Sequence, residues 1–365
     1  MKLAAITSYF EQLAPPNYQE DYDNSGLIVG DLEADISRVL VALDCTEAVI
    51  DEAIALRCGL IVAHHPIVFR GLKKLTGKNY VERVVLKAIK NDIALYAIHT
   101  NLDHVSGGVN SEICRRLGLR DTRILLPKAG LLKKIVTYCP EEAAEKVKDA
   151  LFAVGAGHIG QYSECSFSVR GEGSFKAGEG TAPFVGTPGI RHNEPEQRIE
   201  LIYKVQDERK IISALIENHP YEEVAYDCYA LTNVHEGVGA GMIGWLPEEM
   251  EAQAFLKLLK ENMSARVVRY TAFSDKPVKK IAVCGGSGSF LLKEAVAQGA
   301  HAFVTADFKY HEFFDAEGKL MICDIGHYES EQFTTQLLAA GLEREFPTLH
   351  ISSTQINTNP VNYFV

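Results

Sequence analysis

The chain has 365 residues, of which 47% are hydrophobic and 23% charged, values that are ordinary for a globular protein of more than one domain. Its 48 acidic and 37 basic residues give a net charge of −11, which argues against a general nucleic-acid or anionic-membrane surface. The N-terminus predicts an amphipathic helix instead of a signal peptide, and no apolar run reaches membrane-spanning length. Because the eight cysteines are scattered without a Cys-x-x-Cys pair, we expect buried thiols and a cytoplasmic protein.

The first part of the chain, residues 1–127, alternates predicted strands and helices. Aliphatic runs bounded by polar or glycine-containing segments predict the strands, and apolar residues at helical spacing predict the helices. After the N-terminal helix, we expect strands at 39–43, 60–63 and 93–98, and helices from Glu47, at 81–90 and at 108–117. This rhythm predicts a largely parallel sheet with helices on both faces.

Residues 128–232 follow a different order and predict an inserted domain. Strands are expected at 133–138, 162–169, 198–204 and 224–231, and helices at 140–154 and 208–218. That succession is the βαββαβ order of a ferredoxin-like α+β domain. A glycine-rich loop from Gly171 to His192 is expected to be mobile, with binding of a small ligand as the alternative.

Residues 233–365 return to the first pattern. After a glycine-rich segment, 237–244, that we expect to be flexible, strands are predicted at 281–284, 302–305 and 321–325. The predicted fold class is therefore α/β, with two similar three-layer halves, 1–127 and 233–365, that form one unit interrupted by the insert. The turn Gly285–Ser289 resembles a phosphate-binding turn but lacks the lysine of a P-loop, so a tight turn is the favoured role.

Side chains that bind metals follow three of the predicted strands. His64 and His65 follow strand 60–63, Asp103 follows strand 93–98, and His327 and Glu331 follow strand 321–325. In open α/β sheets, ligands bind at the carboxyl ends of the strands. His327 and Glu331 are four residues apart, so they share one face of the helix that begins there.

This set of three imidazoles and two carboxylates predicts a site for two divalent ions. The mixed nitrogen and oxygen donors favour Zn, Fe, Mn or Co over Ca or Mg. Two such ions about 3.5–4 Å apart can activate a hydroxide and polarise a substrate oxygen. Each motif alone has an ordinary alternative, since a histidine pair can simply close a strand and Asp103 can cap a helix.

Three further polar residues near these strand ends have two possible roles each. His99 either orients a metal ligand or is a hydrogen-bonded loop histidine. Asp307 and His311 either bind substrate near the cavity or belong to an ordinary helix start with exposed charges.

Four stretches of the chain resemble the NIF-three-like dinuclear metal-centre proteins, many bacterial members of which carry the label GTP cyclohydrolase I type 2. They are Tyr-Asp-Asn-Ser-Gly-Leu at 22–27, Ala-His-His-Pro at 63–66, His-Thr-Asn-Leu-Asp at 99–103 and Gly-His-Tyr-Glu-Ser-Glu at 326–331. Tyr22 stands where that family has tryptophan. The resemblance spans 1–127 and 234–365, and it implies a PII- or CutA-like insert.

The resemblance also implies how the ligands divide between two ions per subunit. It pairs His64 with His327 on one ion and His65 with Asp103 on the other, with Glu331 as the bridge. A ring-shaped homohexamer whose metal sites face an internal cavity is implied as well.

The leading functional hypothesis is a metal-dependent hydrolase that acts on a small molecule, and the family label suggests a purine nucleotide such as GTP. One alternative is a metal-binding regulatory or interaction protein without turnover. The other is a metal-dependent phosphoesterase, which would use the same ions on a different bond.

Overall fold

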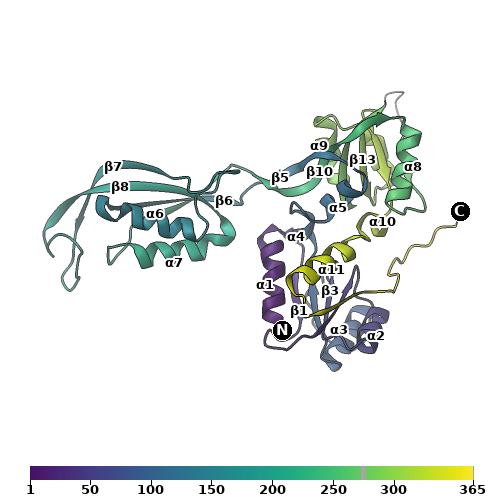
Figure 1. Ribbon diagram of the computed structural model, residues 1–365, viewed down its shortest axis with the longest axis horizontal. Coiled ribbons are helices and arrows are strands. Elements are labelled where there is room, and N and C mark those ends of the chain that lie inside the picture. Colours follow the sequence, from purple (N-terminus) through teal and green to yellow (C-terminus); the bar gives the residue numbers. More distant parts are fainter. Residues whose placement is uncertain (273–276, 365) are drawn as a thin grey trace. The chain divides into compact units, whose positions relative to one another are not determined.

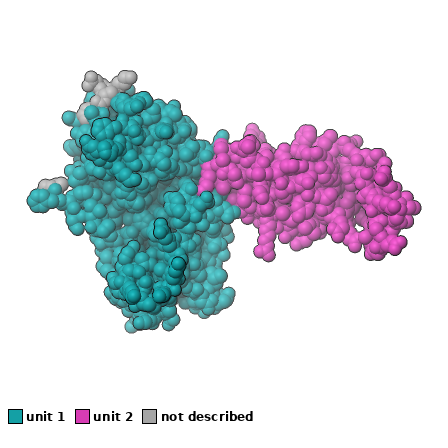
Figure 2. Space-filling view, turned by 180° about the vertical axis from the view of Figure 1, so that it is seen from behind, with its two compact units in different colours: residues 1–127, 236–365 teal, residues 128–235 magenta. Residues whose placement is uncertain are grey.

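The protein is described by a computed structural model that covers residues 1–272 and 277–364 and contains three β-sheets (Figure 1). The chain divides into two compact units: unit 1 comprises residues 1–127 and 236–365, and unit 2 comprises residues 128–235 (Figure 2). Unit 2 therefore interrupts unit 1 in the sequence. Its boundary falls at His235, near the predicted residue 232.

The first sheet of unit 1 has five strands in the order β1-β4-β3-β2-β15. Its strands are β1 (Gly26–Val29), β2 (Arg38–Ala42), β3 (Leu60–Ala63), β4 (Ala94–Ala97) and β15 (His350–Ser353). Four of them are parallel, and β1 is antiparallel to β4 at one edge. The largely parallel sheet expected from the sequence is present, with one antiparallel strand added.

Helices cover both faces of this sheet. They are α1 (Leu3–Leu13), α2 (Glu47–Ala55), α3 (Tyr80–Lys90) and α11 (Thr334–Glu345). Two more helices, α4 (Thr100–Asp103) and α5 (Val109–Arg116), follow β4. Helices α2 and α3 lie side by side over the face that carries Leu95 (Figure 1). On the other face Phe10 of α1 stacks on Tyr96, with ring centroids 5.1 Å apart. Since neighbouring strand residues point to opposite faces, both faces need apolar side chains, and every residue of β3 is buried.

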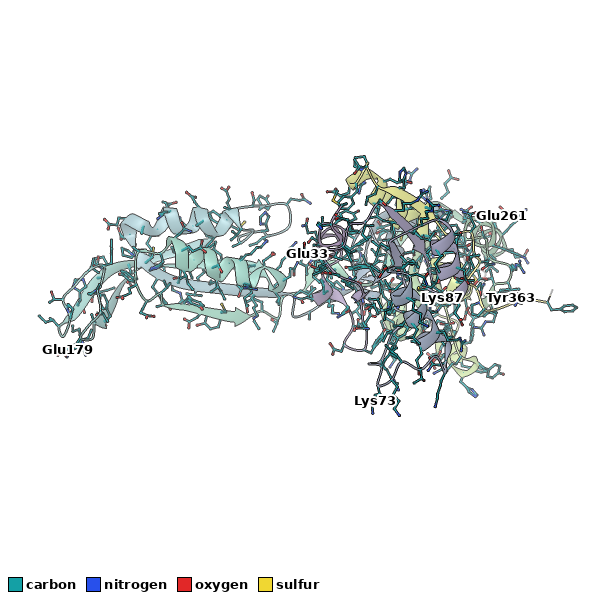
Figure 3. The ribbon with its side chains drawn as sticks, turned by 90° about the horizontal axis from the view of Figure 1, so that it is seen from below. Glu33, Lys73, Lys87, Glu179, Glu261 and Tyr363 are labelled. Carbon is teal, nitrogen blue, oxygen red and sulfur yellow. The ribbon has the colours of Figure 1, made fainter. Side chains whose placement is uncertain are left out.

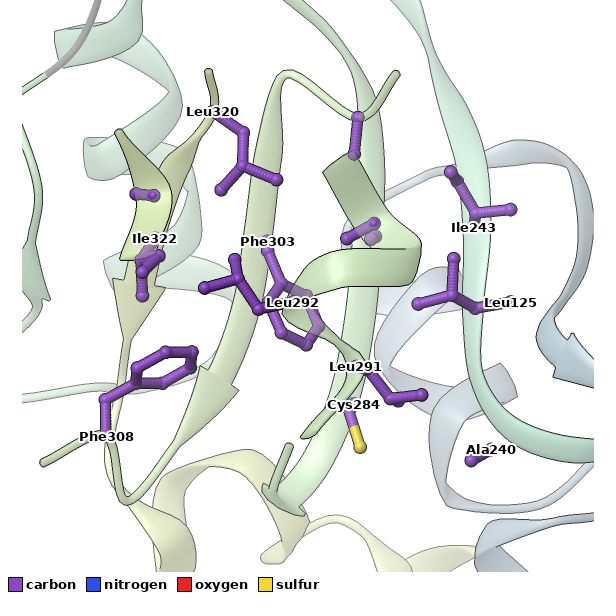
Figure 4. Packing of buried hydrophobic residues seen from close by; sticks show 14 residues of the cluster. Leu125, Ala240, Ile243, Cys284, Leu291, Leu292, Phe303, Phe308, Leu320 and Ile322 are labelled. Carbon is purple, nitrogen blue, oxygen red and sulfur yellow. The ribbon is translucent and has the colours of Figure 1, made fainter. Parts of the chain in front are cut away.

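The second sheet of unit 1 has six strands in the order β11-β14-β13-β12-β10-β5. Its elements are β5 (Arg120–Lys128), β10 (His235–Met250), β11 (Arg269–Tyr270), β12 (Val278–Ser287), β13 (Ala302–Ala306) and β14 (Met321–Asp324), with α8 (Ala252–Asn262), α9 (Leu292–Ala297) and α10 (His327–Glu331). Helix α9 packs on the face that carries Phe303 and Ile322 (Figure 4), whereas α5 and α10 pack against β12.

The expectation of a flexible glycine-rich segment at 237–244 was wrong, because this segment lies inside strand β10 and residues 238–244 are buried. A Cβ atom on Gly239 would fall 2.1 Å from the carbonyl oxygen of Leu126, and one on Gly241 would fall 2.8 Å from Leu291. The glycines therefore allow close packing of the strand against its neighbours.

The two sheets of unit 1 share one arrangement of four strands. In the first sheet β2, β3 and β4 are parallel neighbours in chain order, and β1 lies antiparallel beside β4. In the second sheet β12, β13 and β14 repeat that order, and β11 lies antiparallel beside β14. Each sheet thus has three parallel strands in the same order, and the carboxyl ends of β2, β3 and β4 correspond to those of β12, β13 and β14.

Unit 2 is a four-stranded antiparallel sheet in the order β7-β8-β6-β9. Its elements are β6 (Leu132–Pro140), α6 (Ala144–Ala153), β7 (Phe167–Lys176), β8 (Arg191–Lys204), α7 (Glu208–Asn218) and β9 (Tyr226–Ala230). This is the expected βαββαβ order, and side chains of α6 and α7 form a core with one face of the sheet. Its PII- or CutA-like character stays a prediction.

The predicted loop from Gly171 to His192 was too long, because β7 and β8 pair in continuous register from Phe167↔Glu200 to Lys176↔Arg191. Only residues 177–190 connect the two strands. Two glycines in β7 lowered the apparent strand propensity, although the carboxylate of Glu196 occupies the space beside Gly173.

Six of the eight cysteines are buried, as expected for small apolar side chains. Charged residues such as Glu33, Lys73 and Glu261 project from the surface of unit 1 (Figure 3). Within residues 1–272 and 277–364, no helix has the length and apolar character that crossing a membrane requires.

Candidate metal centre

The five predicted ligands come together in unit 1, where the carboxyl ends of the two sheets approach one another. His64 and His65 directly follow β3, and Asp103 ends helix α4, which follows β4. His327 and Glu331 lie on α10, one turn apart, directly after β14. The ring centroid of His65 is 4.9 Å from that of His64 and 5.3 Å from that of His327.

Three of the imidazoles are held through Nδ1, so that each presents Nε2 to the centre. The Nδ1 atoms donate hydrogen bonds from His64 to the carbonyl oxygen of Ile98 (2.8 Å), from His65 to Asp44 (2.7 Å) and from His327 to Asp307 (2.6 Å). Metal-binding histidines are commonly oriented in this way by an oxygen acceptor at the other ring nitrogen. Asp307 therefore orients His327, a role that differs from the substrate contact and the helix start considered for it from the sequence.

Glu331 is shared by two groups of donor atoms. Its Oε2 lies 3.0 Å from His65 Nε2 and 3.1 Å from His327 Nε2. Its Oε1 lies 3.9 Å from His64 Nε2, which in turn is 3.6 Å from Asp103 Oδ1. Two of the groups that could hold an ion therefore contain Glu331: His65, His327 and Glu331, and His64, Asp103 and Glu331.

The distances group the donors differently from the division that the family resemblance implies. His65 Nε2 lies 3.4 Å from His327 Nε2, and His64 groups with Asp103. Helix α10 lies beside His65, while Asp103 follows β4, to whose end His64 is hydrogen-bonded through Ile98. Which donors share an ion stays a prediction. The central position of Glu331 agrees with a bridging role.

Two buried donor atoms test whether this set fits an ion. His64 Nε2 and Asp103 Oδ1 are both buried and have no hydrogen-bond partner among the described residues. A buried polar atom without a partner costs about 1–3 kcal/mol. A cation between the two atoms would satisfy both, so the residues present fit a metal ion.

The pKa values of the site follow from burial and from the carboxylates. Burial lowers the pKa of His64 to about 3, which keeps this imidazole neutral and able to bind a cation. Burial also disfavours charge on His65 and His327, but hydrogen bonds to Asp44 and Glu331 raise the pKa of His65 to about 10, and Glu331 and Asp307 raise that of His327 to about 11. Burial and the neighbouring charge of Glu331 raise the pKa of Asp103. An ion that binds here must therefore displace protons.

His99 forms a third group with His64 and His65. Its Nδ1 donates to Asp23, 2.7 Å away, in the same way as the other rings are held. Asp23 belongs to the stretch 22–27 that carries the family resemblance, and it also accepts the hydroxyl hydrogen bond of Thr100 at 2.5 Å. His99 is thus fixed beside the donors by a carboxylate that anchors the start of α4.

A glycine pair at the end of β12 makes room for the donors. Gly286 has a positive φ of 60°, and a Cβ atom there would fall 2.5 Å from Glu331 Oε1. A Cβ atom on Gly285 would fall 2.8 Å from Val109 of α5. Instead of forming the predicted tight turn, Gly285 and Gly286 lie in the last residues of β12, where Gly286 allows a close approach of the backbone to Glu331.

The donors open onto a cavity of about 1300 Å³. The segment that follows β15 lines part of it, where the Thr358 hydroxyl donates to Asp44 (2.5 Å) and the Asn359 amide donates to Glu329 (3.2 Å). His311 lies on an exposed 3₁₀ helix, Tyr310–Ala316, and is not among the residues that line the cavity. The proposed substrate contact at His311 is therefore not supported by its position.

Sequence reasoning missed Asp44 and the segment around Thr358. Asp44 was detectable, because it follows predicted strand 39–43 just as His64 follows strand 60–63. No local pattern marks Thr358, since its role depends on a contact with a residue 314 positions earlier.

Comparison with known proteins identifies the family of this chain. The family model described as Duf34/NIF3 (NGG1p interacting factor 3) matches residues 1–360. The chain belongs to the NIF3 family. Its relatives include the GTP cyclohydrolase 1 type 2 homolog of Bacillus subtilis, 40% identical, with 98% of this chain and 97% of the relative covered. The homolog of the same name from Halalkalibacterium halodurans is 42% identical, with 90% of this chain and 89% of the relative covered.

Solved structures of NIF3-like proteins share the fold over the full length. A Bacillus cereus protein related to NIF3 has a TM-score of 0.85 and 39% identity, with 100% of this chain and 99% of that chain covered. A Staphylococcus aureus protein has a TM-score of 0.80 and 29% identity, with the same coverage. These two structures therefore match the insert as well, and the recognition made from the four sequence stretches is confirmed.

Proposed function

We propose that this NIF3 protein is a hydrolase that uses two divalent ions, drawn from Zn, Fe, Mn and Co, at the donors around Glu331. The observation that carries the proposal is one buried carboxylate shared by two three-residue donor groups, one of which contains two buried atoms without partners. Two bound ions would supply an activated water and polarise a substrate oxygen. The large cavity beside the donors supports an enzyme, because a purely structural site needs no space for a substrate.

The residues of the chain have separate tasks in this proposal. His64, His65, His327 and Asp103 bind the ions, with Glu331 between them, and Asp44 and Asp307 hold two of the rings in place. The apolar core beneath β3 limits water behind the donors, so that reaction takes place on the cavity side. By analogy with the names of its relatives, the reaction would open a purine ring by hydrolysis, with GTP as the first compound to try.

Elemental analysis of the purified chain tests the site before any substrate is known. We expect about two first-row divalent ions per chain, with large losses in His65→Ala and Glu331→Ala. His311→Ala is the matched control, because it removes an exposed histidine outside the cavity and should leave the metal content unchanged. Protein that refuses Zn, Fe, Mn and Co would contradict the proposal.

Turnover is tested with the loaded protein and GTP, by detecting formate or a ring-opened product. Release of phosphate instead would favour a phosphoesterase, and absence of any turnover would favour a regulatory metal-binding protein. The family resemblance adds a homohexamer to the proposal, which native mass spectrometry tests directly.

A further inference from the structure

Aromatic rings form one part of the cavity wall next to the metal donors. Tyr22, Phe69, Tyr80 and Phe290 line the cavity and keep 50–69% of their surface exposed. The ring of Phe69 meets that of His99 edge-on, with centroids 5.7 Å apart, so an exposed aromatic face begins directly beside the donor group. Exposed rings in a cavity favour ligands with a flat π-surface, since stacking does not depend on the identity of the ring.

Carboxylates form the other part of the wall. Seven acidic residues line the cavity: Glu20, Asp44, Asp103, Asp307, Asp324, Glu329 and Glu331. Among the described lining residues, Arg269 is the one lysine or arginine. Its guanidinium is engaged by the Asp324 carboxylate and donates to the carbonyl oxygen of Phe308 at 3.1 Å. The cavity therefore offers a ligand no cation that is not already paired with a carboxylate.

Two divalent ions would not reverse this charge. They would add four positive charges against the six negative charges that remain after Arg269 is counted. Besides metal ions, a site that selects polyphosphates usually presents arginine and lysine forks or a helix start with free N–H groups. Here α10 carries two of the metal donors: it begins with His327 and ends with Glu331. It also contains Glu329, so its start is no site for a phosphate.

We propose, on the basis of the hydrolase function above, that the substrate is a planar nitrogen heterocycle with little or no negative charge, such as a purine base or nucleoside. The flat ring stacks on the aromatic wall, and its polar edge reaches the donor groups. A nucleoside triphosphate, which brings several negative charges into a negative cavity, is a poor ligand of this site.

Binding of guanosine, GMP and GTP to the metal-loaded protein tests the proposal by calorimetry, with metal content measured before and after to exclude stripping by the phosphates. We expect guanosine to bind at least tenfold more tightly than GTP, with GMP between them. Added salt should strengthen the binding of GTP, because it screens repulsion, whereas a basic phosphate site would be weakened by salt.

Two variants separate the charge from the aromatic wall. Glu20→Gln removes a lining carboxylate that is not among the metal donors, and it should improve the affinity for GTP relative to guanosine. Glu33→Gln, on an exposed residue outside the cavity, is the control and should change neither. Phe69→Ala should weaken guanosine binding by about 5- to 150-fold while the metal content stays the same.

The possible results distinguish this inference from the hydrolase function on which it rests. GTP that binds as tightly as guanosine, with an affinity that falls as salt rises, would overturn the charge argument even if the protein hydrolyses GTP. Preference for guanosine without turnover in any metal would leave the inference standing and refute the hydrolase. Failure of guanosine, GMP and GTP alike to bind would overturn the inference. The metal content of the same protein would then test the metal site of the proposed hydrolase independently.

Discussion

The two sheets of unit 1 repeat the same arrangement of four strands but contribute different chemistry. The first sheet supplies His64, His65 and Asp103, and the second supplies His327 and Glu331. Where the first sheet has Asp44 after β2, the second has Gly285 and Gly286 in the last residues of β12, the corresponding strand. One half therefore supplies most of the donors, while the other supplies the shared carboxylate and the space in which it fits.

The comparison teaches that the donor groups with a carboxylate need both halves. The groups that contain Asp103 or His327 both depend on Glu331, whereas the third group, His64, His65 and His99, comes from the first half alone. The repeated strand order thus brings the strand ends of the two sheets together. The different residues at those ends provide the metal donors. The predictions below test how far this division of labour holds.

The largest effect is expected from Glu331→Ala. Loss of the shared carboxylate should remove both ions, whereas Asp103→Ala should remove or weaken only the ion beside His64. Elemental analysis with cobalt spectroscopy measures each. If Glu331→Ala keeps two ions, the carboxylate is not shared, and the two halves would hold their ions independently.

Gly286→Ala should also remove the metal, because the added methyl group would displace Glu331 without changing any donor residue. The added Cβ would fall 2.5 Å from Glu331 Oε1, in a backbone conformation with φ of 60°. Gly299→Ala is a matched control, because Gly299 has φ of 72° and open space around it. Both should lose about 1–2 kcal/mol of stability from the positive φ, but only Gly286→Ala should lose metal. Equal metal content in the two variants would refute the close approach.

Metal affinity should rise with pH, since ion binding displaces protons from His65 and His327. Their pKa values of about 10 and about 11 mean that both rings are protonated on both nitrogens, and positively charged, at neutral pH in the metal-free protein. Affinity should therefore increase from pH 6 towards pH 9, about tenfold per pH unit for each proton released. Calorimetry in two buffers of different ionisation enthalpy counts these protons. Binding of an ion without proton release would contradict the hydrogen-bond assignment.

Smaller effects are expected from the residues that orient the rings. Asp44→Asn and Asp307→Asn should each weaken the ion held by His65, His327 and Glu331 by about 10- to 100-fold. The ion beside His64 should be unaffected, because His64 is held by the backbone oxygen of Ile98, which a substitution does not remove. Equal weakening of both ions would show that the two groups are coupled more closely than their separate anchors indicate.

Much of the fold and the donor set follows from the sequence alone. Aliphatic runs with turn residues at both ends identified β2, β3, β4, β13 and β14, and the residues after them are those that meet at the site. The distances among the donors did not follow, because they depend on the direction from which α10 enters. Composition also misled at 237–244, where glycines that allow close strand packing resemble a flexible linker. The edge strands β11 and β15 lack an aliphatic run, since β11 has two residues and β15 is His-Ile-Ser-Ser.

Glu331 lies 266 residues after its hydrogen-bond partner His65. At a synthesis rate of about 5–20 residues per second, roughly 13 to 53 s separate the emergence of these two side chains from the ribosome. During that interval the nascent chain exposes His64, His65 and Asp103 without the carboxylate that completes either group, and all of unit 2 is synthesised in between. Neither group that contains Glu331 could therefore bind an ion with its full set of donors before residue 331 has been synthesised.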